Sequence, residues 1–500
     1  MMNQKDKERK EQVAHIIEIP DEYSLVVDDQ EGVDDPHHLL WWGHKENEEK
    51  QIQVSLNRHT GNVIEFRIDD ENYFSSDKEV IEENKAREIA NVFIKKYVEE
   101  GLEFYTYMSV KDDWRGWKEI KYMQEVNGYP LPDTGCVVRV HPSGNVVNFR
   151  YNGRESIQEK PPLWPSEIVE ESIILDNLKA RQDMRLVFAD LTFSSCVYEN
   201  GEKVKGYHLL YEPEPSHAFI DASTGKNLFG PDHYRLPPTV AVTKPEKSSR
   251  QDDIFDLFDW DKESFTKVDE TENEDGIRLK FVSKEELQKQ KEEKNPYSMN
   301  EFFKKHLPML KYNNLVGITI DKSTNQLIGF IKLTEDKEAK QILSREECLQ
   351  RALQFLERVI PDVTQYLRLW EEREEAEDGI ERFTFSVYVN GIPAEYNQFR
   401  VNINAENGAV MHYSGESSNI IKELLTYETA PKVTKEKALE IYRGAMRVNL
   451  EWFLENDVEE TNYELLYKQT TNENHKAPFD CSREIRYIDA HTGEKIWSEY

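Results

Sequence analysis

The amino-acid sequence repeats itself once, and this duplication restricts the folds open to the chain more than any other feature does. Four segments of the first half return in the second half in the same order. They are 54–66 with 318–330, 126–130 with 389–393, 138–149 with 401–413, and 220–229 with 488–497. The offset stays between 263 and 268 residues, as it does from Thr60 to Thr324. An ordered series at a nearly constant offset predicts two homologous halves.

The two halves begin less alike than they continue. Tyr23 aligns with Phe265 at an offset of only 242 residues, so the second half gains about 22 residues before its first strong match. The charged stretch from Lys284 falls in this interval and predicts a solvated, helical insertion at about 284–310. Residues 231–250 are rich in proline and serine and have the composition of a linker.

Three turn markers recur in each half, each between two short runs of alternating apolar residues. The period near two in residues 138–140 and 146–149 predicts strands. The markers end in glycine or asparagine, which adopt the positive φ of a tight hairpin. Their last residues are Gly61, Gly144, Gly225, Asn325, Gly408 and Gly493. We therefore expect six hairpins of one design and six copies of one structural unit.

Apolar stripes at helical spacing precede several of these hairpins. In residues 76–100 such a stripe recurs every three or four residues and predicts one apolar helix face. It contains Ala86, Ile89, Ala90, Phe93, Ile94 and Tyr97. Four pairs of residues mark helix starts, the first two of them as possible capping boxes. These are Ser76 with Glu79, Ser344 with Glu347, Pro165-Ser166 and Val433-Thr434. In the first and fourth units, the helical segment that precedes the strands is shorter, at 9–17 and 252–258.

Each unit thus consists of one helix followed by a three- or four-stranded antiparallel sheet, which is an α+β arrangement. We expect a first half at 1–230, a linker at 231–250 and a second half at 251–500. The units should lie at about 8–70, 76–152 and 165–230, and then at about 251–335, 344–415 and 433–500. A duplication of this kind also predicts that one half can fold without the other.

The helix, the strands and the final hairpin of each half resemble a PepSY domain. The hairpin motif Ile-Asp-Ala-x-Thr-Gly occurs at 220–225 and 488–493. The double copy, with Val-Asn-Gly-x-Pro loops at 126–130 and 389–393, is similar to the bacterial YcdB/YcdC repeat proteins over nearly the whole chain outside the linker and the insertion. The resemblance implies tandem PepSY- or cystatin-like units. PepSY domains occur in propeptides of thermolysin-like metallopeptidases and are proposed to inhibit or chaperone peptidases, so it also implies a peptidase or its precursor as partner.

The charge and the cysteines limit partners and location. The chain has 64 basic and 96 acidic side chains, and this net charge of −32 disfavours nucleic acid and anionic membrane surfaces. No stretch approaches the ~20 apolar residues that span a bilayer, and the charged residues 1–11 lack the apolar core of a secretory signal. Cys136, Cys196, Cys348 and Cys481 are too far apart for a disulfide framework. We expect a cytoplasmic protein without membrane insertion, although many YcdB/YcdC relatives are exported.

The sequence lacks the common catalytic motifs. It has no HExxH pair, no Walker A loop and no GxSxG elbow. A metal site could use His37, His38 and His44, but adjacent residues of a strand point to opposite faces, so His37 and His38 cannot bind one ion. We predict surface histidines on a strand instead. We therefore predict no catalytic, cofactor-binding or metal-binding residues, and no cofactor.

Two acidic segments and two loops invite other interpretations. Segment 269–276 is rich in oxygen ligands but lacks the glycine and the final glutamate at EF-hand spacing, so we predict a solvated loop. Segment 370–379 has no apolar neighbours to raise a carboxyl pKa and is typical of a solvated charge run. The Asn-Gly pairs at 127–128 and 390–391 predict tight turns, although such loops could contact a peptide.

We expect a non-catalytic protein that binds another protein or a peptide, because open antiparallel sheets offer strand edges and a free face. A scaffolding repeat protein is one alternative, and it predicts no deep pocket. An enzyme with a site between the two halves is the other. It requires a pocket near the linker with convergent polar groups and carboxyl groups of shifted pKa.

Overall fold

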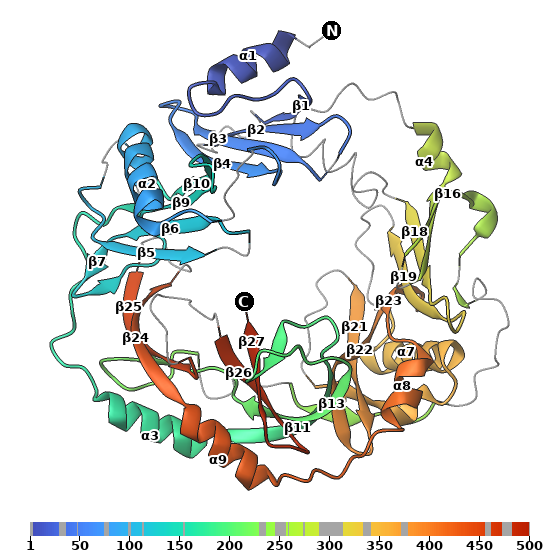
Figure 1. Cartoon of the computed structure of the whole chain (residues 1–500). Helices are drawn as coiled ribbons and strands as arrows, with labels where there is room; N and C mark the ends of the chain where they lie inside the picture. Colours follow the sequence, from blue (N-terminus) through green and yellow to red (C-terminus); the bar gives the residue numbers. More distant parts are fainter. Residues whose placement is uncertain are drawn as a thin grey trace.

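The fold follows the duplication at the level of whole sheets. The computed structural model describes residues 4–29, 37–47, 49–74, 80–98, 102–112, 115–153, 156–229, 237–245, 257–258, 260–273, 276–289, 314–333, 342–371, 379–455, 462–472 and 483–499. One β-rich body, in blue and cyan, is built from the start of the chain, and its copy, in yellow and orange, lies across from it (Figure 1). The last unit of each half lies between them, at the bottom of this view.

The first body is a single antiparallel sheet of eight strands in the order β1-β2-β3-β4-β10-β9-β6-β5. The strands are β1 (Tyr23–Asp29), β2 (His37–His44), β3 (Gln51–Asn57), β4 (Val63–Asp69), β5 (Tyr107–Asp112), β6 (Lys118–Met123), β9 (Cys136–Val140) and β10 (Val146–Tyr151). Helices α1 (Gln4–Val13) and α2 (Glu83–Tyr97) accompany it, and β7 (Glu125–Val126) pairs with β8 (Tyr129–Pro130). Phe66 of β4 lies opposite Phe149 of β10, so the first two repeat units share one sheet and one core.

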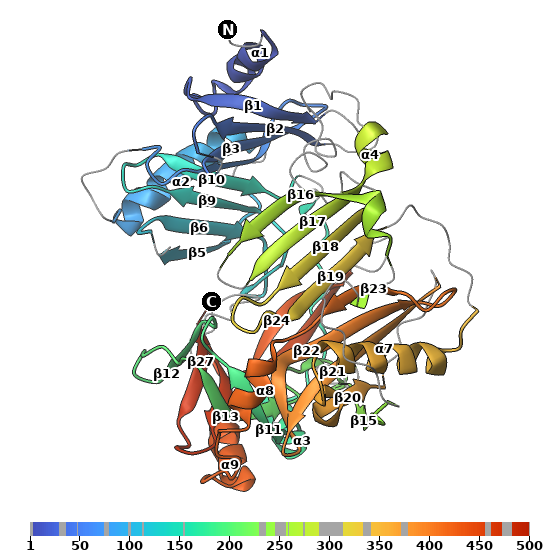
Figure 2. The same cartoon turned by 90° about the vertical axis from the view of Figure 1, so that its right-hand side faces the viewer.

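The second body repeats this order as β16-β17-β18-β19-β23-β22-β21-β20. The strands are β16 (Phe265–Glu272), β17 (Ile277–Ser283), β18 (Leu315–Ile320), β19 (Leu327–Leu333), β20 (Leu367–Trp370), β21 (Ile380–Val389), β22 (Ile392–Asn404) and β23 (Val410–Ser414). Its helical segments are η3 (Lys262–Ser264), α4 (Lys284–Lys289), α7 (Arg345–Val359), η4 (Val363–Tyr366) and α8 (Ser418–Leu424), and the short β15 (Thr239–Ala241) pairs with β20. Figure 2 shows β16 to β19 running side by side into β23. Helix α4 lies in the expected insertion, and residues 290–313 are outside the described residues.

The turn markers behave as the sequence predicts. Their last residues all adopt positive φ: Gly61 73°, Gly144 88°, Gly225 69°, Asn325 54°, Gly408 77° and Gly493 79°. The capping box of Ser344 and Glu347 is formed at the start of α7, whereas Ser76 and Glu79 lie outside the described residues. The prediction that a helix opens near Ser166 is wrong. Helix α3 begins at Glu171, because the Val169 N–H bonds the carbonyl of Ala222 at 2.9 Å and holds the chain before the helix.

The last units of the two halves form the central part of the molecule. From the first half come α3 (Glu171–Arg181), β11 (Asp183–Asp190), β12 (Cys196–Tyr198), β13 (Tyr207–Glu214) and β14 (Phe219–Asp221). From the second half come α9 (Lys435–Ala445), β24 (Arg447–Glu455), β25 (Asn462–Thr470), β26 (Arg483–Asp489) and β27 (Lys495–Glu499). Each unit pairs with the other half: β13 pairs with β26, and β25 pairs with β14. Likewise α3 packs on β24 and β25 of the second half, and α9 packs on β11 and β13 of the first half as well as on β26 of its own.

The exchange is reciprocal down to single hydrogen bonds. The Ala222 N–H donates to the Leu465 carbonyl at 2.9 Å, and its repeat equivalent, the Ala490 N–H, donates to the Leu209 carbonyl at 3.0 Å. Two further bonds also match. They run from the hydroxyl of Tyr211 to the carbonyl of Val433 and from the hydroxyl of Tyr467 to the carbonyl of Val169, both at 2.9 Å. Each half therefore completes the last unit of the other.

A short connection explains why each helix leaves its own strands. Only Gln182 separates α3 from β11, and only Met446 separates α9 from β24. Connections between a helix and the strand on which it packs usually have about two to six residues. A single residue does not let the helix reverse onto the strand that follows it. The helix therefore packs on strands of the other half, and α9 also on β26, which pairs with β13 of that half.

The structure confirms two repeated halves of mixed helix and sheet. It does not confirm six separate units with a helix on a small sheet, because neighbouring units merge into larger sheets across the β4–β10 and β19–β23 pairs. The sheets are correspondingly large, with up to 14 strands in one hydrogen-bonded network. The expected domain boundaries at 230 and 251 stay a prediction, since strands cross between the halves. In the described part of the chain, no helix is both long and apolar enough to cross a membrane.

Candidate functional site

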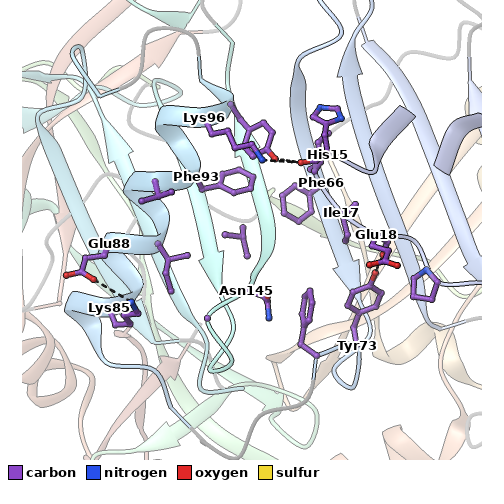
Figure 3. A pocket seen from close by; sticks show the side chains of 18 residues that line it. His15, Ile17, Glu18, Phe66, Tyr73, Lys85, Glu88, Phe93, Lys96 and Asn145 are labelled. Atoms are coloured by element: carbon purple, nitrogen blue, oxygen red, sulfur yellow. Dashed lines mark hydrogen bonds and ion pairs between the residues drawn. The ribbon is translucent and has the colours of Figure 1, made fainter. Parts of the chain in front are cut away.

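An open groove lies over the β4–β10 seam of the first body. It has a volume of about 750 Å³ and runs between α2 and residues 15–20. Figure 3 looks into it: Phe93 of α2 and Phe66 of β4 point inward, and Ile17 and Tyr73 form the wall opposite α2. The seam is where two repeat units join. Residues 15–20 of the first unit and α2 of the second unit lie on the same face of the sheet but leave a gap between them.

Helix α2 divides its apolar stripe between the core and the groove. Ala86, Ala90 and Ile94 are buried against the sheet, as the stripe predicts. The other stripe residues, Ile89, Phe93 and Tyr97, line the groove instead, and next to them Val92 is 69% exposed. The apolar face of α2 is therefore wider than the sheet beneath it covers. Exposed apolar surface concentrated in a concave place is typical of a contact site for another molecule.

Polar contacts fix the two walls of the groove. The Lys96 ammonium lies 3.3 Å from the His15 carbonyl, and the Tyr97 hydroxyl donates to the same oxygen. On the wall opposite α2, the Tyr73 hydroxyl donates to the Glu18 carbonyl. Burial and the charge of Glu18 raise the pKa of Tyr73 well above its ordinary value. The groove thus has defined walls before any partner arrives.

A second, more polar pocket of about 480 Å³ lies where β22 of the second body meets the central strands and the linker. Arg486 of β26 lies at its centre. One guanidinium nitrogen, Nη2, is 3.0 Å from Glu212, 2.7 Å from Glu395 and 2.8 Å from the Tyr396 hydroxyl. The aromatic wall includes Trp370, and residues 237–239 of the linker complete the lining. We call this the junction pocket.

The carboxylates of the junction pocket are enclosed by donors. The Tyr487 hydroxyl donates to Glu395 Oε2 at 2.7 Å, and Arg185 donates to Glu212 Oε2. Each of the four carboxylate oxygens therefore has a partner inside the cluster. Burial and the charge of Glu212 nevertheless raise the pKa of Glu395 above its ordinary value.

One residue that lines the junction pocket, Tyr396, has a strained backbone conformation. Tyr396 adopts φ 65°, and its repeat equivalent Asp133 adopts φ 55°. A large side chain with positive φ is uncommon, and such residues concentrate at functional sites. The left-handed bend is thus a property of both repeats, whereas the polar cluster occurs at this junction alone among the described residues. Lys468 and Asn449 occupy the positions that correspond to Glu212 and Arg185.

Replacing Glu395 by glutamine tests the shifted carboxyl. A pKa raised on folding means that the native state holds a proton that the unfolded state has lost, so wild-type stability falls as pH rises from about 4.3 to the raised value. Glutamine removes this dependence. We expect Glu395→Gln to gain stability relative to the wild type between pH 4.5 and pH 7.5, measured by hydrogen exchange on peptides from β22 and β26 with both proteins at the same pH. Glu406→Gln, at an exposed hairpin position, should show a constant difference; a constant difference for Glu395→Gln would contradict the assignment.

The structure separates the histidines considered in the sequence. His37 is exposed on one face of β2, and the His44 ring packs edge-on against Tyr23. The prediction of surface histidines is wrong for His38, which is buried with Nε2 2.7 Å from Asp28. Within the described ranges, no group of three or more metal-ligating side chains comes together. The absence of catalytic and cofactor-binding residues stays a prediction.

Apart from Trp370, which lines the junction pocket, the described residues of the other sequence candidates lie outside both pockets. Segment 269–276 is the β16–β17 hairpin, with 274–275 outside the described residues, as are 372–378 of the second acidic segment. The Asn-Gly pairs form tight turns, with φ 53° and 86° at 127–128 and 52° and 81° at 390–391. The first of these turns packs against the chain itself, through Tyr129 and Trp164 with ring centroids 5.5 Å apart.

Most residues of the two pockets were not singled out in the sequence. The exposed Val92 beside a wide apolar stripe was the one readable signal for the groove. Glu212, Glu395 and Arg486 are ordinary strand residues in sequence, and only the exchange of strands between the halves brings them together. Distant residues of this kind carry no local motif.

Comparison with known proteins gives consistent matches. The family model described as "YcdB, YcdC repeated domain" matches residues 6–153 and 280–417. The first match covers all eight strands of the first body, and the second covers those of the second body from within β17 onward. YcdB of Bacillus subtilis (strain 168) is 26% identical over 98% of this chain and 97% of its own length. YcdC of the same organism is 22% identical over 89% and 92%. The C-terminal domain of Bacillus megaterium YpeB matches 47% of the chain and 89% of that domain at 16% identity, with a TM-score of 0.23, a likeness too weak to support a conclusion.

Proposed function

The chain belongs to the YcdB/YcdC repeat family, and from this premise we propose that it is a non-catalytic protein that binds an apolar segment of another protein in the groove over β4 and β10. The observation that carries the proposal is the open apolar groove itself, in which Val92, Ile89 and Phe93 of α2 face unfilled space. Removing such surface from water contributes about 25 cal/mol per Å² to association. A scaffold has no need of a groove of this depth, which favours binding over scaffolding.

The resemblance to PepSY domains narrows the class of partner. We propose that the bound segment belongs to a peptidase or to its precursor, and that binding modulates the peptidase. The PepSY-like character of the individual units is part of this proposal. So is a cytoplasmic location, which is in keeping with the three described cysteines, all of them free and buried.

The junction pocket supports a second candidate, an enzyme with its site between the halves. A buried Glu395 with raised pKa, in a pocket lined by the linker, is the arrangement that such an enzyme requires. We rank it second because every oxygen of Glu395 and Glu212 already accepts a hydrogen bond within the cluster. Turnover of any small substrate that Glu395→Gln abolishes would reverse this ranking.

Val92→Glu tests the binding proposal. A library of random peptides displayed on phage is panned against the wild-type protein, and the recovered peptides are measured by fluorescence anisotropy. We expect apolar peptides whose affinity falls at least about tenfold in Val92→Glu, because the substitution places a charge on the apolar wall. Val92 is 69% exposed, so the core is unaffected.

The duplication supplies a matched control. Gln354→Glu alters the equivalent position of α7, which is also exposed, and should leave the affinities unchanged. Circular dichroism of both variants confirms that they fold. A library that yields no peptide sensitive to Val92→Glu would contradict the proposed function.

A further inference from the structure

The duplication provides a second copy of the groove floor. Phe66 and Phe93 of the first body correspond by repeat offset to Phe330 and Phe355 of the second. The third ring of each floor is Phe149 or Tyr413. The rings of Phe93 and Phe149 lie 5.1 Å apart, and those of Phe355 and Tyr413 lie 5.2 Å apart. The two floors therefore have the same construction.

The two floors differ in what lies above them. In the second body, the ring of Phe258 stacks on Phe330 with centroids 3.7 Å apart and planes 8° apart, and it lies 6.0 Å from the ring of Phe355. Phe258 is only 7% exposed, and Leu257 beside it is 8% exposed. Phe355 is 3% exposed as a result of this cover, whereas its counterpart Phe93 stays partly exposed. The chain fills one of its two floors with its own aromatic side chain.

The first body has a smaller residue at the covering position. The offset that aligns Tyr23 with Phe265 places Ile16 opposite Phe258, and Ile16 does line the groove. An isoleucine cannot stack as a phenyl ring does. Phe66 itself is only 1% exposed, so the floor ring that stays open to the groove is Phe93. Its rim carries Lys85 and Lys96 as well as Glu18 and Glu88. Charge is thus balanced at the rim, and the shape and aromatic character of the floor select the ligand.

We propose that the groove of the first body takes a partner segment that presents an aromatic side chain next to an aliphatic one, and that this ring packs against Phe93 as Phe258 packs against Phe355. The inference rests on the proposed function and names the chemistry of its ligand. The pair Leu257-Phe258 is the model for this segment. Aromatic pairs contribute beyond the area that they bury, so an aliphatic residue of similar size is a poorer ligand.

A peptide derived from the chain itself tests the proposal. The probe carries the sequence of residues 253–262 with Phe255 and Trp260 replaced by serine, so that one aromatic residue remains, and it bears a fluorescein label. We expect it to bind the full-length wild-type protein in anisotropy measurements. Replacing Phe258 of the peptide by leucine should weaken binding about fivefold, and alanine should weaken it about a hundredfold.

A self-filling variant gives an independent readout. Ile16→Phe supplies the missing ring from the protein side, so it should abolish binding of the probe and keep or raise the melting temperature. Ile16→Leu, the conservative control, should bind the probe as the wild type does. Loss of binding with an unchanged or raised melting temperature excludes misfolding as the cause.

The outcomes separate the two proposals. Equal affinity of the phenylalanine and leucine peptides, with both lost in Val92→Glu, would overturn the aromatic preference and leave the binding function standing. So would failure of the probe while library peptides without aromatic residues bind in a manner sensitive to Val92→Glu. If neither probe nor library yields a peptide sensitive to Val92→Glu, both proposals fall.

Discussion

Replacing Phe258 by alanine should destabilise the second eight-stranded body by about 3–5 kcal/mol. The ring is buried and stacked on Phe330, and alanine leaves a cavity over the floor formed by Phe330 and Phe355. Unfolding of a chain with several bodies is not a single two-state transition. Hydrogen exchange read by mass spectrometry on peptides from β18, β19 and α7 therefore measures the local loss, and peptides from β3, β4 and α2 should be unaffected.

The matched substitution in the first body is Ile16→Ala. Its side chain already faces an open groove, so we expect a loss of about 1 kcal/mol in the first body and none in the second. The difference between the two losses measures how much the Phe258 ring stabilises the second body by covering its floor. Equal losses in the two bodies would show that the groove of the first body is as closed as its counterpart.

Neither half of the chain should fold fully when it is made alone. A cut after Asp232 leaves β15 with the second half and separates β13 from β26 and β25 from β14. Each fragment then exposes the apolar faces that α3 and α9 cover in the intact chain. We expect low solubility and no cooperative unfolding of the last unit in either fragment, and a soluble one-to-one complex when both are made together. This expectation replaces the simpler one that the duplication alone suggests.

A cut elsewhere serves as the control. Residues 4–153 contain the complete first sheet and its core, and this fragment should fold cooperatively because no strand of that sheet comes from the rest of the chain. Size-exclusion chromatography and thermal unfolding decide both cases. A monomeric, cooperatively folded 1–232 fragment with a protected β13 would contradict the role of the exchange.

Local chemistry made much of the fold predictable. The six hairpins follow from glycine or asparagine at the end of each marker, because those residues determine the turn by themselves. The stripe on α2 and the cap of α7 are equally local. The merging of neighbouring units into one sheet could not be predicted, because the β4–β10 and β19–β23 pairs depend on which strand edges meet, and an alternating pattern does not identify the neighbouring strand.

The candidate sites depend on long-range geometry and were correspondingly hidden. The pairing of β13 with β26 brings Glu212 beside Arg486, which is 274 residues away in the chain. One clue to the exchange was present, since Gln182 leaves no room for α3 to reverse onto β11, but helix ends cannot be placed to a single residue from sequence. The groove was partly visible in Val92, an apolar residue beside the predicted buried stripe.

The one-residue connections at Gln182 and Met446 would prevent a half-length chain from completing its last unit by itself. A half-length ancestor with this connection would have had to borrow strands from a second copy of itself, as a symmetric homodimer does. Fusion of two such subunits makes the assembly independent of protein concentration, because the linker holds the second partner at a high effective concentration. Two halves joined in this way can also differ: the second covers its floor with Phe258, and the first leaves its groove open. Among the described residues, one of the two contacts between them holds a cluster of carboxylates and arginines.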